Sequence, residues 1–300
     1  MSRKGLYLTI GVNSLDSAAY GGPGTLGGCE NDARDMARIA EDQGFSGATL
    51  LTANATSASV LTEMRRVAGN LDSGDIFLLT FSGHGGQVPD INGDGETDEL
   101  DETWCLYDRQ LIDDELYAMW NEFKSGVRIL VISDSCNSGT VAKSLFRQVK
   151  HRPFDLGSPE DMHLAFTLNS DFIAGLRGGP GKLIKGLPLR RSMANYARFK
   201  DDYDKLQQAA GPSAKSASSL AASVILISGC QDGESSWDNG TGGDFTQALK
   251  KAWAGGQFKG THHDFWTAIA AGDLEPSQNP NYYPVGAENP DFERERPFTI

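Results

Sequence analysis

A histidine and a cysteine stand where they could act together as a proton-transfer group and a nucleophile. His84 follows an apolar run over residues 75–82, and Cys136 follows a second apolar run over residues 127–133. Continuous apolar runs of this length are typical of strands that are buried on both faces. If the two strands are neighbours in a parallel sheet, their carboxyl ends bring the imidazole and the thiol to the same edge. A thiolate attacks carbonyl carbon atoms, and an imidazole beside it accepts and returns the proton.

Glycines surround both residues and would let a substrate approach the backbone closely. Backbone N–H groups at such a position can stabilise the negative charge that develops on a carbonyl oxygen during attack. We expect the N–H group of Gly85 to be one donor, with that of Cys136 beside it. The alternative interpretation is an unreactive buried cysteine and an unrelated loop histidine.

The remainder of the chain alternates between strand-like apolar runs and helical patterns, which is typical of one α/β domain with a parallel sheet. The regular pattern weakens between about residues 140 and 220. Strands are expected over residues 6–12, 48–52, 75–82, 127–133, 223–228 and 281–285, with a hairpin over 103–112, and helices over 31–43, 56–71, 113–123, 190–208, 245–254 and 263–271.

Two motifs resemble the active-site motifs of the caspase-like cysteine peptidases, the group that contains caspases, metacaspases and paracaspases. They are Phe-Ser-Gly-His-Gly at residues 81–85 and Asp-Ser-Cys-Asn-Ser-Gly at residues 134–139. The Asp-Ser-Cys sequence is similar to the metacaspase and prokaryotic orthocaspase branch. The resemblance implies a caspase-like three-layer α/β sandwich, in which helices cover both faces of a mostly parallel six-stranded sheet. It also implies a single peptidase domain with a large-subunit-like part (1–140), a linker (141–220) and a small-subunit-like part (221–300).

The resemblance further implies a pocket for the residue before the scissile bond, at Cys29, Asp32, Ser82 and Asp134. In the family this pocket is acidic and accepts Arg or Lys. The residue types agree, because two carboxylates beside a nucleophile select a cation, and Arg can bind a carboxylate through two N–H groups. On its own, Asp32 could equally serve the start of the first helix. The sequence therefore predicts a cysteine endopeptidase that cleaves polypeptides after Arg, with Lys as a second candidate, and not after Asp.

Residues 90–101 have the spacing of oxygen-bearing side chains found in a calcium-binding loop, with glycine at the sixth position. The loop departs from that pattern at its last position, where Asp101 replaces the usual glutamate. Metacaspases, which the chain resembles, need calcium at a site near the hairpin that follows the catalytic histidine. The resemblance implies that Asp101, Asp113 and Asp114 are acidic positions of that site, although Lys143 replaces a further one. The alternative is a solvated acidic loop. We expect activation by Ca²⁺, with the candidate ligands Asp90, Asn92, Asp94, Asp98, Asp101, Asp113 and Asp114.

The linker carries several basic residues, namely Arg177, Lys182, Lys185, Arg190 and Arg191. An Arg-directed peptidase with such a linker is expected to cut itself there, and the candidate sites are Arg177, Arg190 and Arg191. One alternative is that a separate upstream protease makes the cut, and another is that the segment is only a surface insertion. In a further alternative, Arg190 occupies the acidic pocket and inhibits the uncut enzyme.

The composition and charge of the chain exclude several kinds of binding partner and location. The net charge of −13 disfavours binding to nucleic acid. There is no apolar stretch long enough to cross a membrane, and four cysteines without a Cys-x-x-Cys pair indicate reduced thiols in a cytoplasmic protein. The proline beside the last strand favours a monomer. A second class of function is a catalytically silent caspase-fold adaptor, and an α/β-hydrolase is disfavoured because Cys136 lies in no Gly-x-Ser-x-Gly elbow.

Overall fold

The computed structural model describes residues 2–92, 100–136, 181–211, 220–231, 234–276 and 278–300. Its centre is a six-stranded sheet with the order β11-β9-β7-β3-β1-β2, in which β11 runs antiparallel to β9 and the other neighbours are parallel. The expected mostly parallel sheet is therefore confirmed. Its strands are β1 (Gly5–Gly11), β2 (Ser46–Leu51), β3 (Ile76–Ser82), β7 (Arg128–Asp134), β9 (Ser223–Ser228) and β11 (Asn281–Gly286).

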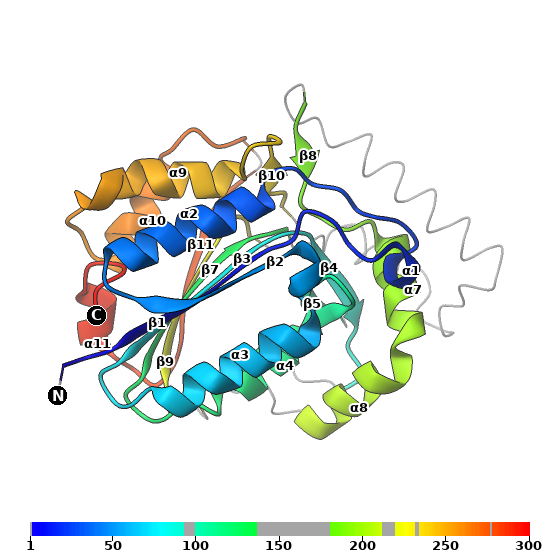
Figure 1. Cartoon of the computed structure of the whole chain (residues 1–300), viewed down its shortest axis with the longest axis horizontal. Coiled ribbons are helices and arrows are strands. Elements are labelled where there is room, and N and C mark those ends of the chain that lie inside the picture. Colours follow the sequence, from blue (N-terminus) through cyan, green and yellow to red (C-terminus); the bar gives the residue numbers. More distant parts are fainter. Residues whose placement is uncertain (1, 93–99, 137–180, 212–219, 232–233, 277) are drawn as a thin grey trace.

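Helices cover both faces of this sheet, and Figure 1 shows them as two layers with the sheet between them. One layer contains α2 (Cys29–Asp42), α9 (Asp244–Trp253), α10 (His262–Ala270) and the short α11 (Pro290–Arg294). The other layer contains α3 (Ser57–Asn70) and α4 (Asp113–Trp120). None of the helices described has the length and hydropathy required to cross a bilayer.

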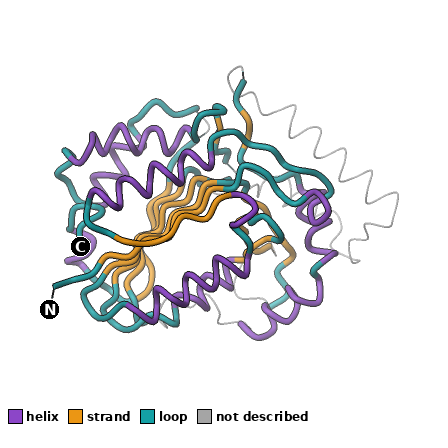
Figure 2. The backbone as a smooth tube through the Cα atoms, viewed as in Figure 1, coloured by secondary structure: helices purple, strands orange, loops and turns teal. Residues whose placement is uncertain are grey.

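Each central strand supplies side chains to two hydrophobic cores, one on each side of the sheet. In β3, Phe77, Leu79 and Phe81 point into the core below α3, whereas Ile76 and Leu78 point into the core below α2 and α9. Successive side chains of a strand alternate between faces, so a strand that serves two cores must be apolar throughout. That requirement explains why β3 and β7 are mostly apolar, and every residue of both strands is buried. Figure 2 shows the strands as an orange layer between the purple helices.

Smaller elements complete the fold at the carboxyl edge of the large sheet. A three-stranded antiparallel sheet contains β4 (Gly85–Pro89), β5 (Leu100–Cys105) and β6 (Gln110–Ile112), and a two-stranded ribbon contains β8 (Leu183–Ile184) and β10 (Trp237–Asp238). The remaining elements are α1 (Ser17–Tyr20), η1 (Thr52–Asn54), α7 (Leu189–Arg198), α8 (Lys200–Ala210) and η3 (Ala254–Gly256).

The single helix predicted over residues 190–208 is instead two helices, α7 and α8, which meet at Phe199. The backbone of Phe199 leaves the helical region, with φ −112° and ψ 23°. The break has a packing cause, because α7 lies against β4 whereas α8 lies against α4. Side chains near the break, including Tyr196 and Phe199, pack around the buried Tyr203.

The register of β3 on β7 positions the two residues of chemical interest. Ser82 pairs with Asp134 at the carboxyl ends of these neighbouring parallel strands. His84 and Cys136 each stand two residues beyond that pair, where the chain leaves the sheet. The sheet thus delivers an imidazole and a thiol to one edge without any contribution from long loops.

Candidate active site

The backbone segments that carry His84 and Cys136 touch each other. A Cβ atom built on Gly85 would lie 1.8 Å from the carbonyl oxygen of Cys136, so no side chain fits at that position. The N–H group of Gly83 also faces the carbonyl oxygen of Asp134 at 3.4 Å. Glycine beside the histidine therefore has a steric purpose here, because it lets the two strand ends close to contact distance.

The imidazole of His84 is buried and oriented by a backbone carbonyl. Its Nε2 atom lies 3.0 Å from the carbonyl oxygen of Gly24. A carbonyl can only accept a hydrogen bond, so Nε2 carries the proton in the neutral ring and Nδ1 is left as the basic nitrogen. Nδ1 has no hydrogen-bond partner among the described residues. Burial lowers the pKa of His84 to about 4, so the ring is neutral at physiological pH.

The thiol of Cys136 is fully buried, and its neighbours include the backbone of Ser236 and the thiol of Cys230. Its Sγ donates to the carbonyl oxygen of Ser236 at 3.4 Å and accepts a hydrogen bond from the Ser236 N–H group. The thiol of Cys230 donates to the carbonyl oxygen of Ser135, the residue directly before Cys136. Burial raises the pKa of Cys136 well above its usual value, and the neighbouring Cys230 raises it further. The resting thiol is therefore protonated.

A segment of the linker crosses this site directly after β8. The carbonyl oxygen of Lys185 accepts hydrogen bonds from the N–H groups of Gly85 at 2.8 Å and of Cys136 at 3.4 Å. The N–H group of Lys185 donates to the carbonyl oxygen of Ser236, and that of Leu187 donates to the carbonyl oxygen of Gly85, at 2.9 and 2.7 Å. The Lys185 carbonyl thus lies where an oxyanion would form during attack by Cys136.

The side chain of Lys185 fills an acidic pocket. Its Nζ atom lies 3.0 Å from Asp134 Oδ2, 3.2 Å from Asp32 Oδ2 and 2.9 Å from Ser82 Oγ. Both carboxylates and the ammonium group are almost completely buried. Burial acts to lower the pKa of Lys185, but Asp134 and Asp32 outweigh it and the pKa is raised. Burial raises the pKa of Asp32 to about 6, although Lys185 opposes the increase.

The structure therefore brings together all four residues predicted for the pocket. Cys29 is the fourth, at the start of α2, and its buried thiol lies 4.0 Å from Asp238 Oδ2. Burial raises the pKa of Cys29 to about 12, so the thiol stays neutral and does not compete for the cation.

Residues from the last third of the chain complete the pocket and were not predicted. Gly243 donates its N–H group to Asp32, and Thr246 donates its N–H and hydroxyl groups to Asp134 Oδ2 at 3.1 and 2.6 Å. A Cβ atom on Gly243 would lie 2.0 Å from Asp134 Oδ2 and 2.3 Å from Lys185 Nζ. No sequence signal marked these positions, because their role depends on where α9 starts relative to a distant sheet edge.

Three of the predicted calcium ligands form a cluster. Carboxylate oxygens of Asp101, Asp113 and Asp114 lie within 4.8 Å of one another, and both Asp101 and Asp114 are buried. Asn92 donates its side-chain amide to Asp114 Oδ2 at 2.8 Å, and Asp90 accepts from the backbone N–H group of Asn92. Two other candidates, Asp94 and Asp98, and also Lys143, lie outside the described residues.

The predicted self-cleavage positions do not lie in the acidic pocket. Arg190 and Arg191 stand in the first turn of α7, and Arg177 lies outside the described residues. The alternative in which Arg190 fills the acidic pocket is wrong, because Arg190 is exposed and Lys185 occupies that pocket. The physical reason is backbone pairing: the β8–β10 ribbon leads Lys185, and not a helical residue, into the site.

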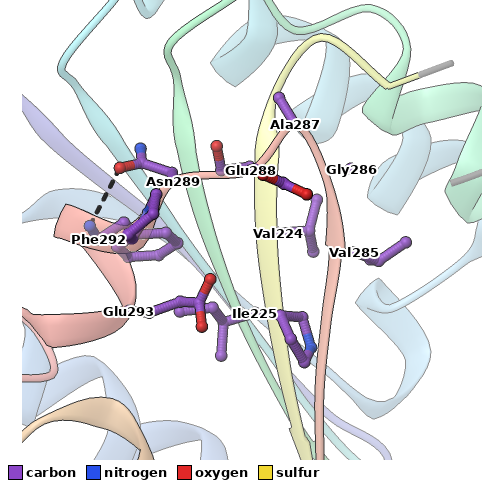
Figure 3. A pocket seen from close by; sticks show the side chains of 12 residues that line it. Val224, Ile225, Val285, Gly286, Ala287, Glu288, Asn289, Phe292 and Glu293 are labelled. Carbon is purple, nitrogen blue, oxygen red and sulfur yellow. Dashed lines mark hydrogen bonds between the residues drawn. The ribbon is translucent and has the colours of Figure 1, made fainter. Parts of the chain in front are cut away.

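A second hollow lies at the opposite end of β9 and β11, beside α11 (Figure 3). Its lining includes Val224, Ile225 and Glu293, and the side chain of Asn289 accepts a hydrogen bond from the N–H group of Phe292 there. This is the amino end of β9, whereas the thiol and imidazole lie at the carboxyl ends of β3 and β7. Neither a cysteine nor a histidine lines this hollow.

Two N–H groups around one peptide carbonyl, with a thiol and a neutral imidazole at the same edge of the sheet, are typical of a cysteine-nucleophile hydrolase. The profile of the caspase domain family matches residues 4–283, and the chain belongs to this family of cysteine peptidases.

Similar proteins agree with that assignment. Metacaspase-1A of Aspergillus fumigatus is 30% identical over 263 residues, which cover 82% of this chain and 59% of that protein. Metacaspase-1 of Cryptococcus neoformans is 27% identical over 265 residues, covering 82% and 53%. The chain therefore spans little more than half the length of these relatives.

Two solved structures share the fold. The crystal structure of protein GSU0716 from Geobacter sulfurreducens is 39% identical, with a TM-score of 0.81 and coverage of 99% of both chains. Caspase-1 from Spodoptera frugiperda is 11% identical, with a TM-score of 0.50 and coverage of 95% of this chain and 86% of that one.

Proposed function

We propose that the chain is a cysteine endopeptidase that hydrolyses the peptide bond after a basic residue, Lys or Arg. The observation that carries the proposal is the way in which Lys185 lies in the site. Its ammonium group sits between two buried carboxylates, and its carbonyl accepts from the N–H groups of Gly85 and Cys136. A peptide substrate with a basic residue would make the same contacts.

The chemistry follows from the protonation states. Cys136 transfers its thiol proton to Nδ1 of His84 as sulfur attacks the carbonyl carbon of the basic residue. The N–H groups of Gly85 and Cys136 stabilise the oxyanion. His84 then gives the proton to the leaving amine, which breaks the C–N bond and leaves a thioester. Water, which loses a proton to His84, hydrolyses the thioester and regenerates the thiol. The carbonyl of Gly24 holds the ring in the required tautomer throughout.

Charge explains the preference for basic residues. With the pocket empty, Asp32 and Asp134 would be two buried carboxylates side by side, and a substrate cation relieves their repulsion. An acidic substrate residue would add a third negative charge without a partner. The planar guanidinium group of Arg can bind a carboxylate through two N–H groups, so Arg is accommodated by the same chemistry as Lys.

We further propose that the uncut chain is inhibited by its own linker, and that cleavage after Lys185 opens the site. The proposal is supported by the Lys185 carbonyl, beside the Lys185–Gly186 bond, which accepts from the N–H groups of Gly85 and Cys136. While this segment is docked, no other peptide can enter. Arg190 and Arg191 remain predicted cleavage sites for the stage after the segment has been released.

The test uses purified full-length protein and fluorogenic peptides that end in Lys, Arg, Gln or Asp, with Cys136→Ala as the inactive control. We expect turnover of the Lys and Arg peptides alone, and intact mass should show cleavage after Lys185 that is absent from Cys136→Ala. Turnover of the Asp peptide at an equal rate contradicts the proposed specificity. Absence of turnover of every peptide favours the alternative of a catalytically silent adaptor.

Calcium binding is proposed at the acidic cluster of Asp101, Asp113 and Asp114. The donor set fits Ca²⁺, which prefers several carboxylate oxygens, and two of these carboxylates are buried. When bound, the ion would neutralise the cluster and fix the start of α4 against β5. Calorimetric titration of Ca²⁺ into Cys136→Ala should show binding that Asp114→Asn weakens at least tenfold. Equal affinity of the two proteins would exclude this cluster as the site.

A further inference from the structure

The docked linker carries a second basic residue, Lys182, three positions before Lys185. The two residues between them form β8, in which Leu183 pairs with Asp238 and Ile184 pairs with Trp237 of β10. An extended strand rises by about 3.3 Å per residue, so Lys182 lies at most roughly 10 Å from Lys185. Its position is therefore determined by the same backbone pairing that places the Lys185 carbonyl.

Lys182 ends between two carboxylates that do not belong to the first pocket. Its Nζ atom lies 2.7 Å from Asp244 Oδ2 and 2.5 Å from Glu275 Oε1. Asp244 is the first residue of α9 and also accepts from the side-chain amide of Asn239 at 3.3 Å. Glu275 comes from the segment between α10 and β11. Two separate parts of the small-subunit-like region thus converge on one ammonium group.

The contact is partly shielded from solvent, with side-chain exposures of 25% for Lys182, 7% for Asp244 and 21% for Glu275. Burial acts to lower the pKa of Lys182, but its hydrogen bonds to Asp244 and Glu275 outweigh it and the pKa is raised. Two carboxylates around one ammonium group favour a cation over a neutral side chain at this position. By contrast, the intervening Leu183 is 47% exposed and meets no comparable site.

We propose that Asp244 and Glu275 form a second acidic subsite, which selects substrates with a basic residue three positions before the basic residue at the scissile bond. The inference rests on the proposed function, because the docked Lys185 defines the direction and register of the substrate. The enzyme would then select substrates with two positively charged side chains three positions apart. It would select little at the position that Leu183 occupies in the linker, because that side chain is exposed.

The size of the effect follows from the contacts. A hydrogen bond between a substrate and a charged group contributes roughly tenfold or more to kcat/KM. Because Lys182 and Glu275 are partly exposed, we expect a basic residue at this substrate position to raise kcat/KM by only the lower end of that range, roughly tenfold.

The experiment separates this inference from the proposed function. Four fluorogenic tetrapeptides carry Lys or Gln at the first position, Leu-Ile in the middle, and Lys or Gln at the fourth position. The enzyme is the full chain with Lys182→Gln after it has cut itself at Lys185, as confirmed by intact mass, so that the linker no longer fills either subsite. It is compared with the same chain carrying Glu275→Gln, and with a control carrying Asp273→Asn, an exposed carboxylate two residues away.

We expect Lys at the first position to raise kcat/KM roughly tenfold, and Glu275→Gln to remove most of that preference while Asp273→Asn preserves it. Equal kcat/KM for Lys and Gln at the first position, with Lys still required at the fourth, overturns the second subsite and leaves the proposed function intact. An equal loss in Asp273→Asn also overturns it, because the effect would then be one of net charge. If no peptide is cleaved, or Lys at the fourth position has no advantage, the proposed function fails and the subsite with it.

Discussion

Replacing Lys185 with methionine should destabilise the folded chain strongly, because methionine keeps most of the apolar stem of the side chain and removes the ammonium group. In the native structure one ammonium group lies 3.0 and 3.2 Å from two carboxylates, and all three groups are nearly inaccessible to solvent. Lys185→Met leaves Asp32 and Asp134 as buried negative charges without that cation. The variant is made in the Cys136→Ala chain, so that no proteolysis interferes.

Removing one partner of a buried ion pair costs about 3–5 kcal/mol, because an uncompensated charge remains in a poorly solvated site. The surface pair of Lys124 and Asp72 is the matched control. Its side chains are 56% and 67% exposed, and such pairs contribute about 0–1 kcal/mol. Lys124→Met should therefore cost at least about 2 kcal/mol less than Lys185→Met.

The loss should also depend on pH in a defined direction. The pKa of Asp32 is about 6 in the folded chain, above its ordinary value of 3.8, and removal of Lys185 should raise it further. A carboxyl group with a raised folded-state pKa binds its proton more tightly in the folded state, so stability increases as pH falls through that pKa. Lys185→Met should therefore cost less at about pH 5 than at about pH 8.

Urea denaturation of the Cys136→Ala chain, with and without each lysine substitution, measures these differences at both pH values. A loss for Lys185→Met at about pH 8 that is no larger than the loss for Lys124→Met would refute the reasoning. So would a loss that grows as the pH falls, because burial of two carboxylates could not then be its cause.

Two other substitutions test the site. In a chain with Lys185→Gln, Cys230→Ala should lower the pKa of Cys136, and the pH midpoint of alkylation by iodoacetamide should fall; an unchanged or higher midpoint contradicts the role assigned to Cys230. Gly243→Ala should reduce kcat/KM on basic peptides at least tenfold, because its Cβ atom would lie 2.0 Å from a pocket carboxylate. Gly69→Ala, a helical position with open space, is the control and should leave kcat/KM unchanged, so equal effects of the two alanines would count against this steric cause.

Much of the central sheet and the proximity of His84 and Cys136 could be predicted because both depend on local patterns. β3 and β7 are apolar at every position where they serve two cores, and this requirement is visible in the residues themselves. His84 and Cys136 directly follow those strands, so parallel pairing of two neighbours suffices to bring them together. A close backbone approach at the glycine beside the histidine could also be predicted, because such an approach requires glycine and the residue type is visible in the sequence.

The helix expected over residues 190–208 shows where such reasoning ends. Its helical pattern was real, but the division at Phe199 depends on α7 and α8 packing against different elements. Local propensity favours helix on both sides of Phe199. It contains no information about β4 and α4, the elements against which the two helices pack.

The sequence by itself determined which residue types stand at the carboxyl ends of two buried strands, and hence the candidate nucleophile and its candidate proton-transfer partner. Only the tertiary structure decided that Lys185, rather than Arg190, enters that pocket, that Gly24 orients His84, and that Asp244 lies beside a second lysine. The reason is physical: these contacts depend on long-range backbone pairing, as between β8 and β10, whose partners lie far apart along the chain. Side-chain periodicity reports which face of an element is buried, but not which distant backbone it meets.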